Sequence, residues 1–351
     1  MFSKLSQVME IFNQRATIRK ELFETDTDSD DTSDESEDIE EKKNRFSFDD
    51  FVDQRGATAA KDVFGFEVGE VRELCAVLEP CIRKSGRGRR GMSAIDVLAI
   101  FLCWATSGLP FTKISSLLGG ISKSTVERNV KIIVTRAKTI LVQKFLPQSL
   151  DRQRTTLTFT NFPNAVGALD ATVVTIWKPS DKEKQKFYYD GKHKDHTIKF
   201  QILVGPDGVA LHLSQIVEGK KHDKKLFDES DILSFLSYDR VVGRATRIVR
   251  HQILCDSGYV GINATIPEAQ IALKKPAGGE LTAEEKANNK NLSHDRVIME
   301  NFFARMKVLF GIVAEDYRGV ISDLNDLIPI LVSLTNYHIR KHPIRRTEAT
   351  N

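Results

Sequence analysis

The chain has 351 residues, of which 41% are hydrophobic and 28% charged, and this length fits one large domain with a smaller one, or two medium domains. Its four cysteines form no Cys-x-x-Cys pair, which argues against a zinc site or a disulfide framework and predicts buried or free thiols in a reducing compartment. The longest apolar run, residues 94–105, contains Asp96 and is too short to span a bilayer, and the N-terminus lacks the layout of a signal peptide, so we expect a soluble intracellular protein with no membrane partner.

The net charge of +3 conceals a strong asymmetry. Residues 21–41 contain twelve Asp or Glu and no Lys or Arg, whereas residues 42–351 contain 47 basic and 35 acidic side chains, a net charge of +12. The strongly basic charge of residues 42–351 favours a polyanionic partner such as nucleic acid. A basic surface that is merely solvated explains the charge alone equally well.

The first 45 residues fall into two regions. Residues 1–20 carry a weakly amphipathic pattern that fits a short helix or no stable structure. Residues 21–45 are centred on an acidic run, 25–41, with one apolar residue and no aromatic one. This run repels itself and cannot offset its ordering entropy by burial, so we expect it to be disordered. Composition does not separate a solvated linker from a substrate of acid-directed kinases.

Residues 46–150 carry a helical pattern and form the first predicted domain. Residues 67–84 have apolar residues at helix spacing, and a basic, Gly-rich loop follows at 84–91. Ser93 is a suitable N-cap for a buried helix over residues 94–107.

Two further helices, residues 112–118 and about 122–143, are separated by a Gly-Gly break. This layout is that of a helix-turn-helix DNA-binding module, whose second helix enters the major groove. An ordinary helical hairpin is the alternative, because short helix–Gly–helix segments are common. In the DNA-binding interpretation, the polar residues that open the second helix contact base edges: Lys123, Ser124, Thr125 and Arg128.

From residue 160 to 342 the pattern changes to strands that alternate with helices, which forms the second predicted domain. Three strands, a helix, a strand, a short strand and a long helix is the order of an RNase H-like fold, with a Gly-Pro-Asp-Gly hairpin turn at 205–208. The predicted fold class is therefore α/β, an RNase H-like catalytic domain preceded by an all-α helix-turn-helix domain. The expected strands are 166–177, 197–204, 209–217, 247–255 and 271–274, and the expected helices are 223–235, 293–310 (N-cap Ser293) and 324–339.

Three carboxylates stand at chemically informative places in this order. Asp170 lies inside the first strand among apolar neighbours, where a bound cation would offset the cost of burying its charge. Asp256 follows the fourth strand, at a strand end where α/β sheets bind ligands. Glu300, on the long helix, shares a face with Arg296 and Lys307. A solvated acid is the usual explanation for a lone helical Glu, but the set can converge and supply oxygen ligands for two Mg²⁺ or Mn²⁺ ions.

Five segments, in order, resemble the successive motifs of Harbinger-type DDE transposases. The resemblance spans residues 66–340, and the Lys-rich stretch that begins at Lys178 is more charged than the family pattern. It implies that Asp170, Asp256 and Glu300 form the catalytic triad. Asp223 resembles a family position of open role, an auxiliary site residue or simply a helix N-cap. The segments are GALDATVV, KFYYDGKHK, EGKKHDKKLF, LCDSGY and HDRVIMENFFARMKVLFG.

The resemblance implies a metal-dependent endonuclease and strand transferase. Such an enzyme cuts phosphodiester bonds at transposon ends and joins the freed 3′-OH to target DNA, without a covalent protein intermediate. The implied partners are double-stranded DNA (terminal inverted repeats and target), a Myb-like DNA-binding protein and further copies of the chain, in the nucleus. Arg296, Lys307 and the basic clusters at 83–90 and 178–194 are expected to contact phosphates.

Two other functions remain open at this point. A domesticated descendant would be a DNA-binding or adaptor protein without transposition activity, although retention of all three acids argues against it. An RNase H-like nuclease that acts on RNA or repair intermediates would leave the helix-turn-helix pattern unexplained. His193 and His196 have His-x-x-His spacing but no Cys companion, so we interpret them as strand-entry or phosphate contacts and not as a zinc site.

Overall fold

A computed structural model describes residues 45–82, 92–150, 155–242, 245–276 and 278–345. The chain divides into two compact units, Met1–Ile133 with Val308–Gly311, and Val134–Lys307 with Ile312–Asn351. Three predictions lie outside the described residues: the short helix over 1–20, the acidic segment 21–45 up to residue 44, and the basic loop 84–91.

The first unit is helical, and α4 (Ala94–Ser107) is buried along nearly its whole length. Ser93 caps α4 as predicted. Its hydroxyl accepts from the Asp96 backbone N–H at 3.2 Å, and the Asp96 carboxylate accepts from the Ser93 N–H at 3.3 Å. This capping box satisfies two backbone donors at the helix start. The other helices are α2 (Phe48–Phe64), α3 (Val68–Ile82), α5 (Phe111–Leu117) and α6 (Lys123–Arg136).

Two glycines separate α5 from α6. Gly119 and Gly120 have φ angles of 78° and 79°, a left-handed conformation that glycine adopts at little cost. The Ser122 hydroxyl then accepts from the Thr125 backbone N–H at 3.2 Å and caps α6. The predicted helix, Gly break and second helix are confirmed as elements.

The predicted second helix is divided, because α7 (Lys138–Phe145) follows α6 as a separate helix. α7 packs against α12 (Leu324–Lys341) in the second unit. The side-chain amide of Asn336 donates to the Phe145 carbonyl at 3.0 Å. These contacts lie within the second unit, which begins at Val134.

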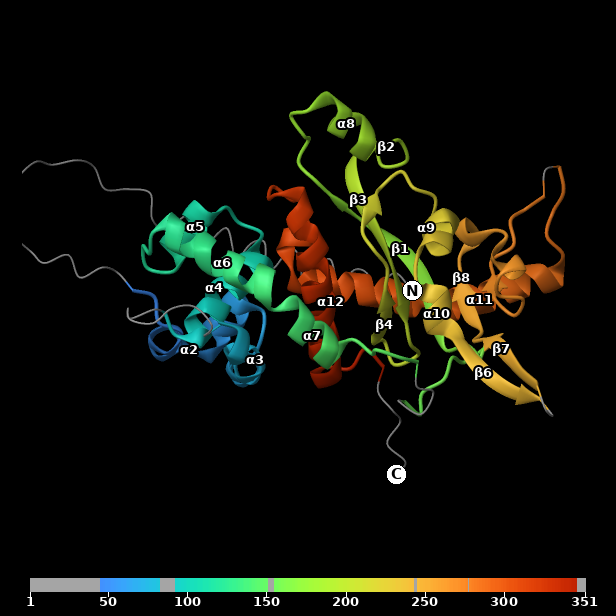
Figure 1. The fold of residues 1–351 in the computed structure, drawn as a ribbon, viewed down its shortest axis with the longest axis horizontal. Coiled ribbons are helices and arrows are strands. Elements are labelled where there is room, and N and C mark those ends of the chain that lie inside the picture. The colour runs from blue at the N-terminus through green and yellow to red at the C-terminus, as the bar shows by residue number, and fades with distance from the viewer. Residues whose placement is uncertain (1–44, 83–91, 151–154, 243–244, 277, 346–351) are drawn as a thin grey trace, which may run out of the picture. The chain divides into compact units, whose positions relative to one another are not determined.

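The second unit is built on one mixed sheet, in which the strand order is β2-β3-β1-β8-β9 and β4 and β5 also pair with β3 (Figure 1). β1 runs antiparallel to β3 and parallel to β8, and β8 runs parallel to β9. The predicted turn between β3 and β4 is confirmed: the Gly208 N–H donates to the Gly205 carbonyl at 2.9 Å. The strands are β1 (Gly167–Thr175), β2 (Tyr189–Asp190), β3 (Asp195–Val204), β4 (Ala210–Leu213), β5 (Val217–Glu218), β8 (Ile253–Cys255) and β9 (Gln270–Ile271).

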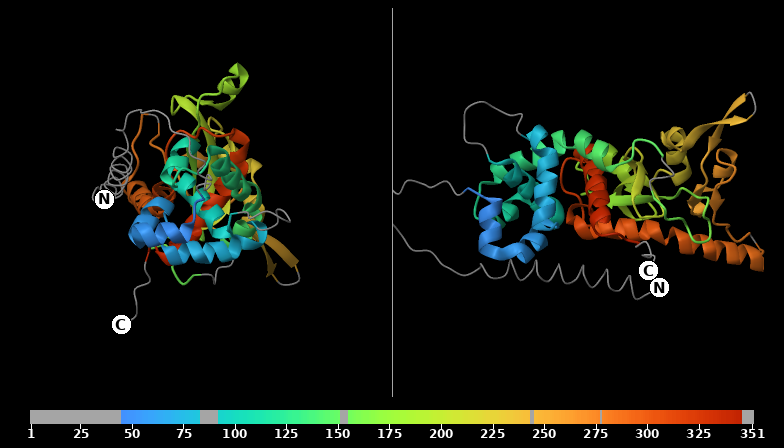
Figure 2. Two further views of the ribbon diagram at one scale, coloured as in Figure 1. Left: turned by 90° about the vertical axis from the view of Figure 1, so that its left-hand side faces the viewer. Right: turned by 90° about the horizontal axis from the view of Figure 1, so that it is seen from below.

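Helices and a separate two-stranded ribbon, β6–β7, accompany this sheet. The predicted helix over 223–235 is two short helices, and the predicted strand over 247–255 is divided between the end of β7 and β8. The ribbon extends away from the main sheet (Figure 2). These elements are α8 (Lys182–Tyr188), α9 (Asp223–Glu229), α10 (Ile232–Leu236), β6 (Ser237–Val242), β7 (Ala245–Arg250) and α11 (Ala283–Leu309).

The long helix α11 begins at Ala283, so the prediction that Ser293 is its N-cap is wrong: Ser293 lies inside the helix. Thr282 forms the cap, accepting from the Glu285 N–H at 3.1 Å and donating its own N–H to the Glu285 carboxylate at 2.7 Å. The first ten residues of α11 are polar and rich in Ala, Glu and Lys, which favour a helix without an apolar stripe. Apolar periodicity alone therefore does not reveal them.

The core of the second unit forms where the sheet meets α9 and α10. Leu169, Leu203, Ile253 and Phe227 are fully buried in it, together with Tyr259. Three of the four cysteines, Cys81, Cys103 and Cys255, are buried, as predicted. In the part of the chain that the structure describes, no single helix is long and apolar enough to cross a membrane, and the bent pair α4–α5 meets that test by length and composition only.

Candidate active site

The register between two parallel strands places Asp170 beside Asp256. β1 and β8 pair up to Leu169 opposite Cys255. Asp170 is the next residue of β1, and Asp256 is the first residue after β8. Side chains at equivalent positions of adjacent strands point to the same face. The Asp256 carboxylate accepts from the Gly258 N–H at 2.7 Å, which starts a turn directly after the strand. Two of the three predicted catalytic acids are thus brought together.

The Asp170 carboxylate is partly enclosed, with 26% of its side chain exposed. One oxygen accepts from the Arg296 guanidinium at 2.8 Å, and the other accepts from the Ala171 N–H at 2.8 Å. Burial raises the pKa of Asp170 to about 6; Arg296 opposes this rise, and the charges of Asp256 and Asp223 add to it. Added positive charge at this point would stabilise the ionised carboxylate.

Asp223 is the third acid at this place. His222 is the N-cap of α9 and Asp223 its first residue, so the N-cap explanation of Asp223 does not hold. The Asp223 carboxylate accepts from Lys199 Nζ at 3.0 Å. A Cβ atom built on Gly258 would lie 2.9 Å from Asp223 Oδ2 and 2.9 Å from Asp256 Oδ1. Both carboxylates therefore face one backbone position, at which any side chain would crowd them.

Helix α11 brings Arg296 to Asp170 and carries Glu300 one turn further along. Residues four apart share a helix face, so Glu300 lies on the side that Arg296 presents to Asp170, and its side chain is exposed. The sequence interpretation gives Arg296 a phosphate contact, whereas the structure engages it in an ion pair with 16% of its side chain exposed. Lys307 is half-buried, and burial lowers its pKa.

Sequence reasoning missed two residues, Asp295 and Lys199. Asp295 is fully buried, and its carboxylate accepts from the backbone N–H groups of Asn161 at 2.8 Å and Phe162 at 3.1 Å. These bonds attach α11 to the segment that leads into β1 and so help to hold Arg296 against Asp170. A His-Asp-Arg tripeptide on a helix gives no sign in sequence of such a distant contact.

The donor chemistry of the site fits a hard divalent cation. Asp170, Asp223 and Asp256 offer carboxylate oxygens, which Mg²⁺ and Mn²⁺ prefer. A bound cation would offset the burial, and the smaller effect of the neighbouring acids, that raise the Asp170 pKa. Within the described residues, no three His, Cys, Asp or Glu side chains are already grouped so as to hold a metal ion. The His-x-x-His pattern makes no site, since His193 Nδ1 lies 2.7 Å from Asp190 instead.

The residues predicted to read DNA lie at the start of α6, in the first unit. Lys123, Ser124 and Arg128 are exposed, and Thr125 is half-buried. The Thr125 hydroxyl lies 2.8 Å from that of Ser122, as part of the helix cap. The opposite face of α6 is apolar and buried, so the polar face is the one that solvent reaches.

Comparison with known proteins agrees with this geometry. Residues 169–336 match the family described as DDE superfamily endonuclease, a superfamily that generally uses divalent metal ions. Over 202 residues the chain is 29% identical to a protein of Microchaete diplosiphon named probable transposase for insertion sequence element IS702; the match covers 57% of this chain and 64% of that protein, less than two thirds of its length. No solved structure matches the chain. Residues 169–336 are thus similar to a DDE superfamily endonuclease domain, and the chain is similar to a transposase.

Proposed function

We propose that the chain is a cut-and-paste DNA transposase of the Harbinger type. The observation that carries the proposal is the meeting of Asp170 and Asp256 at the ends of paired parallel strands, with Arg296 of α11 bound to Asp170. The matches to a DDE superfamily endonuclease and to a transposase support it.

In this proposal, residues 160–342 form an RNase H-like nuclease domain. The support is a central β1 that pairs antiparallel with β3 and parallel with β8, followed later in the chain by the long helix α11, which carries Glu300. Residues 46–150 contain the helix-turn-helix, supported by the glycine break and the exposed polar start of α6. A Myb-like partner, assembly into oligomers and action in the nucleus complete the proposal.

Asp170, Asp256 and Glu300 would hold two divalent ions, Mg²⁺ or Mn²⁺, with Asp223 as an auxiliary residue. Such ions, when bound, polarise the scissile phosphate and stabilise charge on the attacking and leaving oxygens. The chain's own side chains arrange the site. Lys199 donates a hydrogen bond to Asp223, and Arg296 balances the charge of Asp170. Water attacks first, and the freed 3′-OH then attacks target DNA, so the protein needs no nucleophile of its own.

The test uses the full chain and end-labelled duplex DNA that carries the inverted repeats flanking its coding region. With Mg²⁺, the wild-type chain should cut at the repeat end and expose a 3′-OH, and Asp256→Asn should bind the same DNA without cutting it. Cleavage by Asp256→Asn at the wild-type rate would overturn the assignment of the site. An absence of cleavage by the wild type, even with a Myb-like partner added, would overturn the transposase proposal.

A further inference from the structure

The Lys-rich segment after β1 carries positive charge and apolar surface together. Residues 178–194 contain six lysines and three acids. Arg318 lies 4.5 Å above the centre of one aromatic ring here, and Lys220 lies 5.6 Å above another. Of the six large hydrophobic side chains that are exposed among the described residues, four lie on or beside this segment, which neither the core nor the catalytic acids explain: Trp177, Phe187, Tyr189 and Val320.

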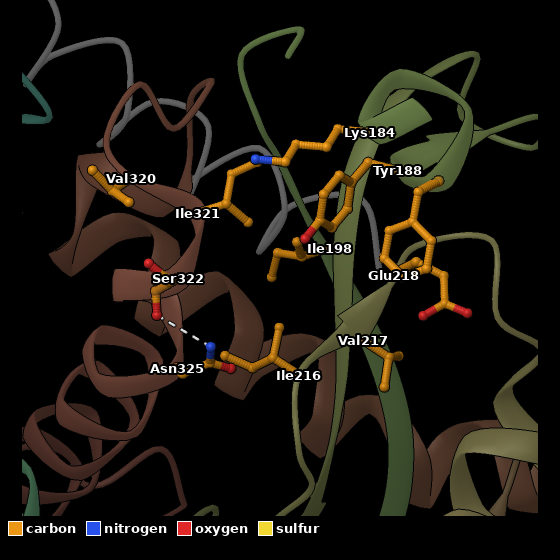
Figure 3. Close-up of a pocket in the computed structure, with 11 residues that line it drawn as sticks. Lys184, Tyr188, Ile198, Ile216, Val217, Glu218, Val320, Ile321, Ser322 and Asn325 are labelled. Atoms are coloured by element: carbon orange, nitrogen blue, oxygen red, sulfur yellow. Dashed lines mark hydrogen bonds between the residues drawn. The ribbon is translucent and has the colours of Figure 1, made fainter. Parts of the chain in front are cut away.

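A cavity of about 430 Å³ opens beside this segment (Figure 3), a volume in the range of small-ligand pockets. Its walls come from α8, from the β3–β5 pair and from the turn that precedes α12. Figure 3 shows Lys184 and Tyr188 on one wall and Val320 on the other. Most of the lining is apolar or aromatic, with Glu218 and Asn325 among its few polar side chains.

The sheet relates this cavity to the catalytic acids. Ile198 lines the cavity and pairs with Val174 of β1, four residues after Asp170. An even spacing along a strand keeps two residues on the same face, and four residues span about 13 Å. Bases follow one another about 3.4 Å apart along a strand, so the cavity lies roughly four nucleotides from the site on the same face of the sheet.

We infer that this cavity binds an unpaired base of the DNA strand on which the catalytic acids act, an inference that rests on the proposed function. A paired base is stacked inside the duplex and has to leave it to enter a side pocket. Phe187 and Tyr188 offer ring faces on which any base stacks. The lysines around them neutralise the adjacent phosphates. Charge alone would suit an intact duplex, but an aromatic pocket under that charge suits a nucleotide taken out of it.

The experiment measures the affinity of the full chain, without Mg²⁺, for a short blunt duplex and for the same duplex with unpaired thymines in one strand. Fluorescence anisotropy reports both. The wild type should prefer the duplex with unpaired thymines. Two variants test the pocket: Phe187→Ala removes a ring that is 48% exposed, and Ile216→Trp fills the cavity. Each should reduce the preference for the duplex with unpaired thymines about tenfold and leave the affinity for the blunt duplex unchanged. Lys275→Ala, in an exposed lysine outside the segment, is the matched control and should not alter the preference.

Each other result has a definite meaning. If Phe187→Ala and Ile216→Trp weaken both duplexes equally, the segment is only a phosphate-binding surface and the inference is wrong. A wild type that binds both duplexes equally overturns the base pocket and leaves the proposed function intact. A wild type that binds neither duplex, even with a Myb-like partner added, overturns both.

Discussion

A carboxylate beside apolar strand residues is costly unless positive charge or hydrogen bonds compensate it. Asp170 obtains both, from Arg296 and from the Ala171 N–H, yet burial and its acidic neighbours still raise its pKa. Additional positive charge at the site would therefore stabilise the ionised carboxylate of Asp170. Glu300 is placed differently, because its side chain is exposed one turn beyond Arg296. It contributes nothing visible to the fold, which makes a functional role easier to test.

Glu300→Gln should abolish metal-dependent cleavage while leaving stability and DNA affinity nearly unchanged, because it removes a ligand charge and almost no volume. The loss should exceed about a hundredfold, since changes to groups that merely support metal ligands cost up to that much. The measurement is single-turnover cleavage of end-labelled repeat DNA. Glu284→Gln, an exposed glutamate of the same helix, is the control. Undiminished cleavage by Glu300→Gln would remove Glu300 from the proposed ligand set.

The sequence allowed two of these acids to be located with a physical reason. Asp170 and Asp256 follow from the strand pattern alone, one inside an apolar strand and one directly after another. The role of Asp223 could not be predicted, because it depends on how the turn at Gly258 faces the start of α9. Asp295 was equally hidden, because its partners precede β1 and nothing in the sequence links the two segments.

At the scale of the element, α11 is the part that the sequence described least well and on which the site depends most. Its apolar stripe predicted the second half, whereas the first half is held by its cap and by helix-favouring residues. Asp295 ties this helix to the segment before β1 through two backbone N–H groups. This buried carboxylate therefore helps to fix the position of Arg296 relative to Asp170.

Asp295→Ala should lower the free energy of unfolding by roughly 2–4 kcal/mol, because two hydrogen bonds to a charged group are lost and both backbone N–H groups lose their acceptor. Asp295→Asn keeps an oxygen for both N–H groups and should recover most of this. Urea unfolding gives the stability. At a temperature where Asp295→Ala remains folded, its cleavage rate should still be reduced. Ser293→Ala, exposed on the same helix, should change neither quantity, and a stable Asp295→Ala protein would show that the anchor is dispensable.

The pair of β4 and α10 provides a pH-dependent element. Burial lowers the pKa of His212 on β4, partly opposed by Asp231, which lies 2.9 Å from the ring. Below the ordinary histidine pKa of about 6.5 the unfolded chain gains a proton that the folded chain does not, so this contribution to stability is present above that pH and is lost as the pH falls.

His212→Gln, which keeps a donor for Asp231 but never titrates, should lose less stability than the wild type between pH 7.5 and pH 5.5, values chosen about one unit either side of that pKa. Urea unfolding of both proteins at the two pH values measures the difference, and subtraction removes the contribution of other titrating groups. Identical losses in the two proteins would show that His212 remains free to take up its proton in the folded state.

At the scale of the whole molecule, composition and periodicity predicted a helical part followed by an α/β part, and the described residues show both. The boundary could not be read from the sequence, because α7 looks like a continuation of α6 and only its contacts with α12 assign it to the second unit. The strand β6 and the helix α8 were missed for a related reason. Neither carries the alternating apolar pattern by which the strands of the main sheet were predicted.

Under the proposed function, reading a DNA sequence and cutting DNA fall to different units of the chain. Arg128 is exposed at the start of α6, where the side chains of a recognition helix reach base edges. Arg128→Ala should cost on the order of 1–3 kcal/mol of binding to the terminal repeat and little on a scrambled duplex. Lys307 lies half-buried on α11 and is proposed to contact a phosphate. Lys307→Ala should therefore weaken binding to both duplexes alike, lower the salt slope of binding by about one unit and slow cleavage.

Binding of each variant to repeat and scrambled duplexes across a salt series separates these roles, because a base contact changes discrimination whereas a phosphate contact changes the salt slope. Equal weakening of both duplexes by Arg128→Ala would show that α6 holds the backbone and does not read the sequence. Discrimination would then have to come from the proposed Myb-like partner. In that case, the Arg128→Ala protein and the wild type should show the same preference for the repeat once such a partner is added, because the loss of a backbone contact weakens both duplexes alike.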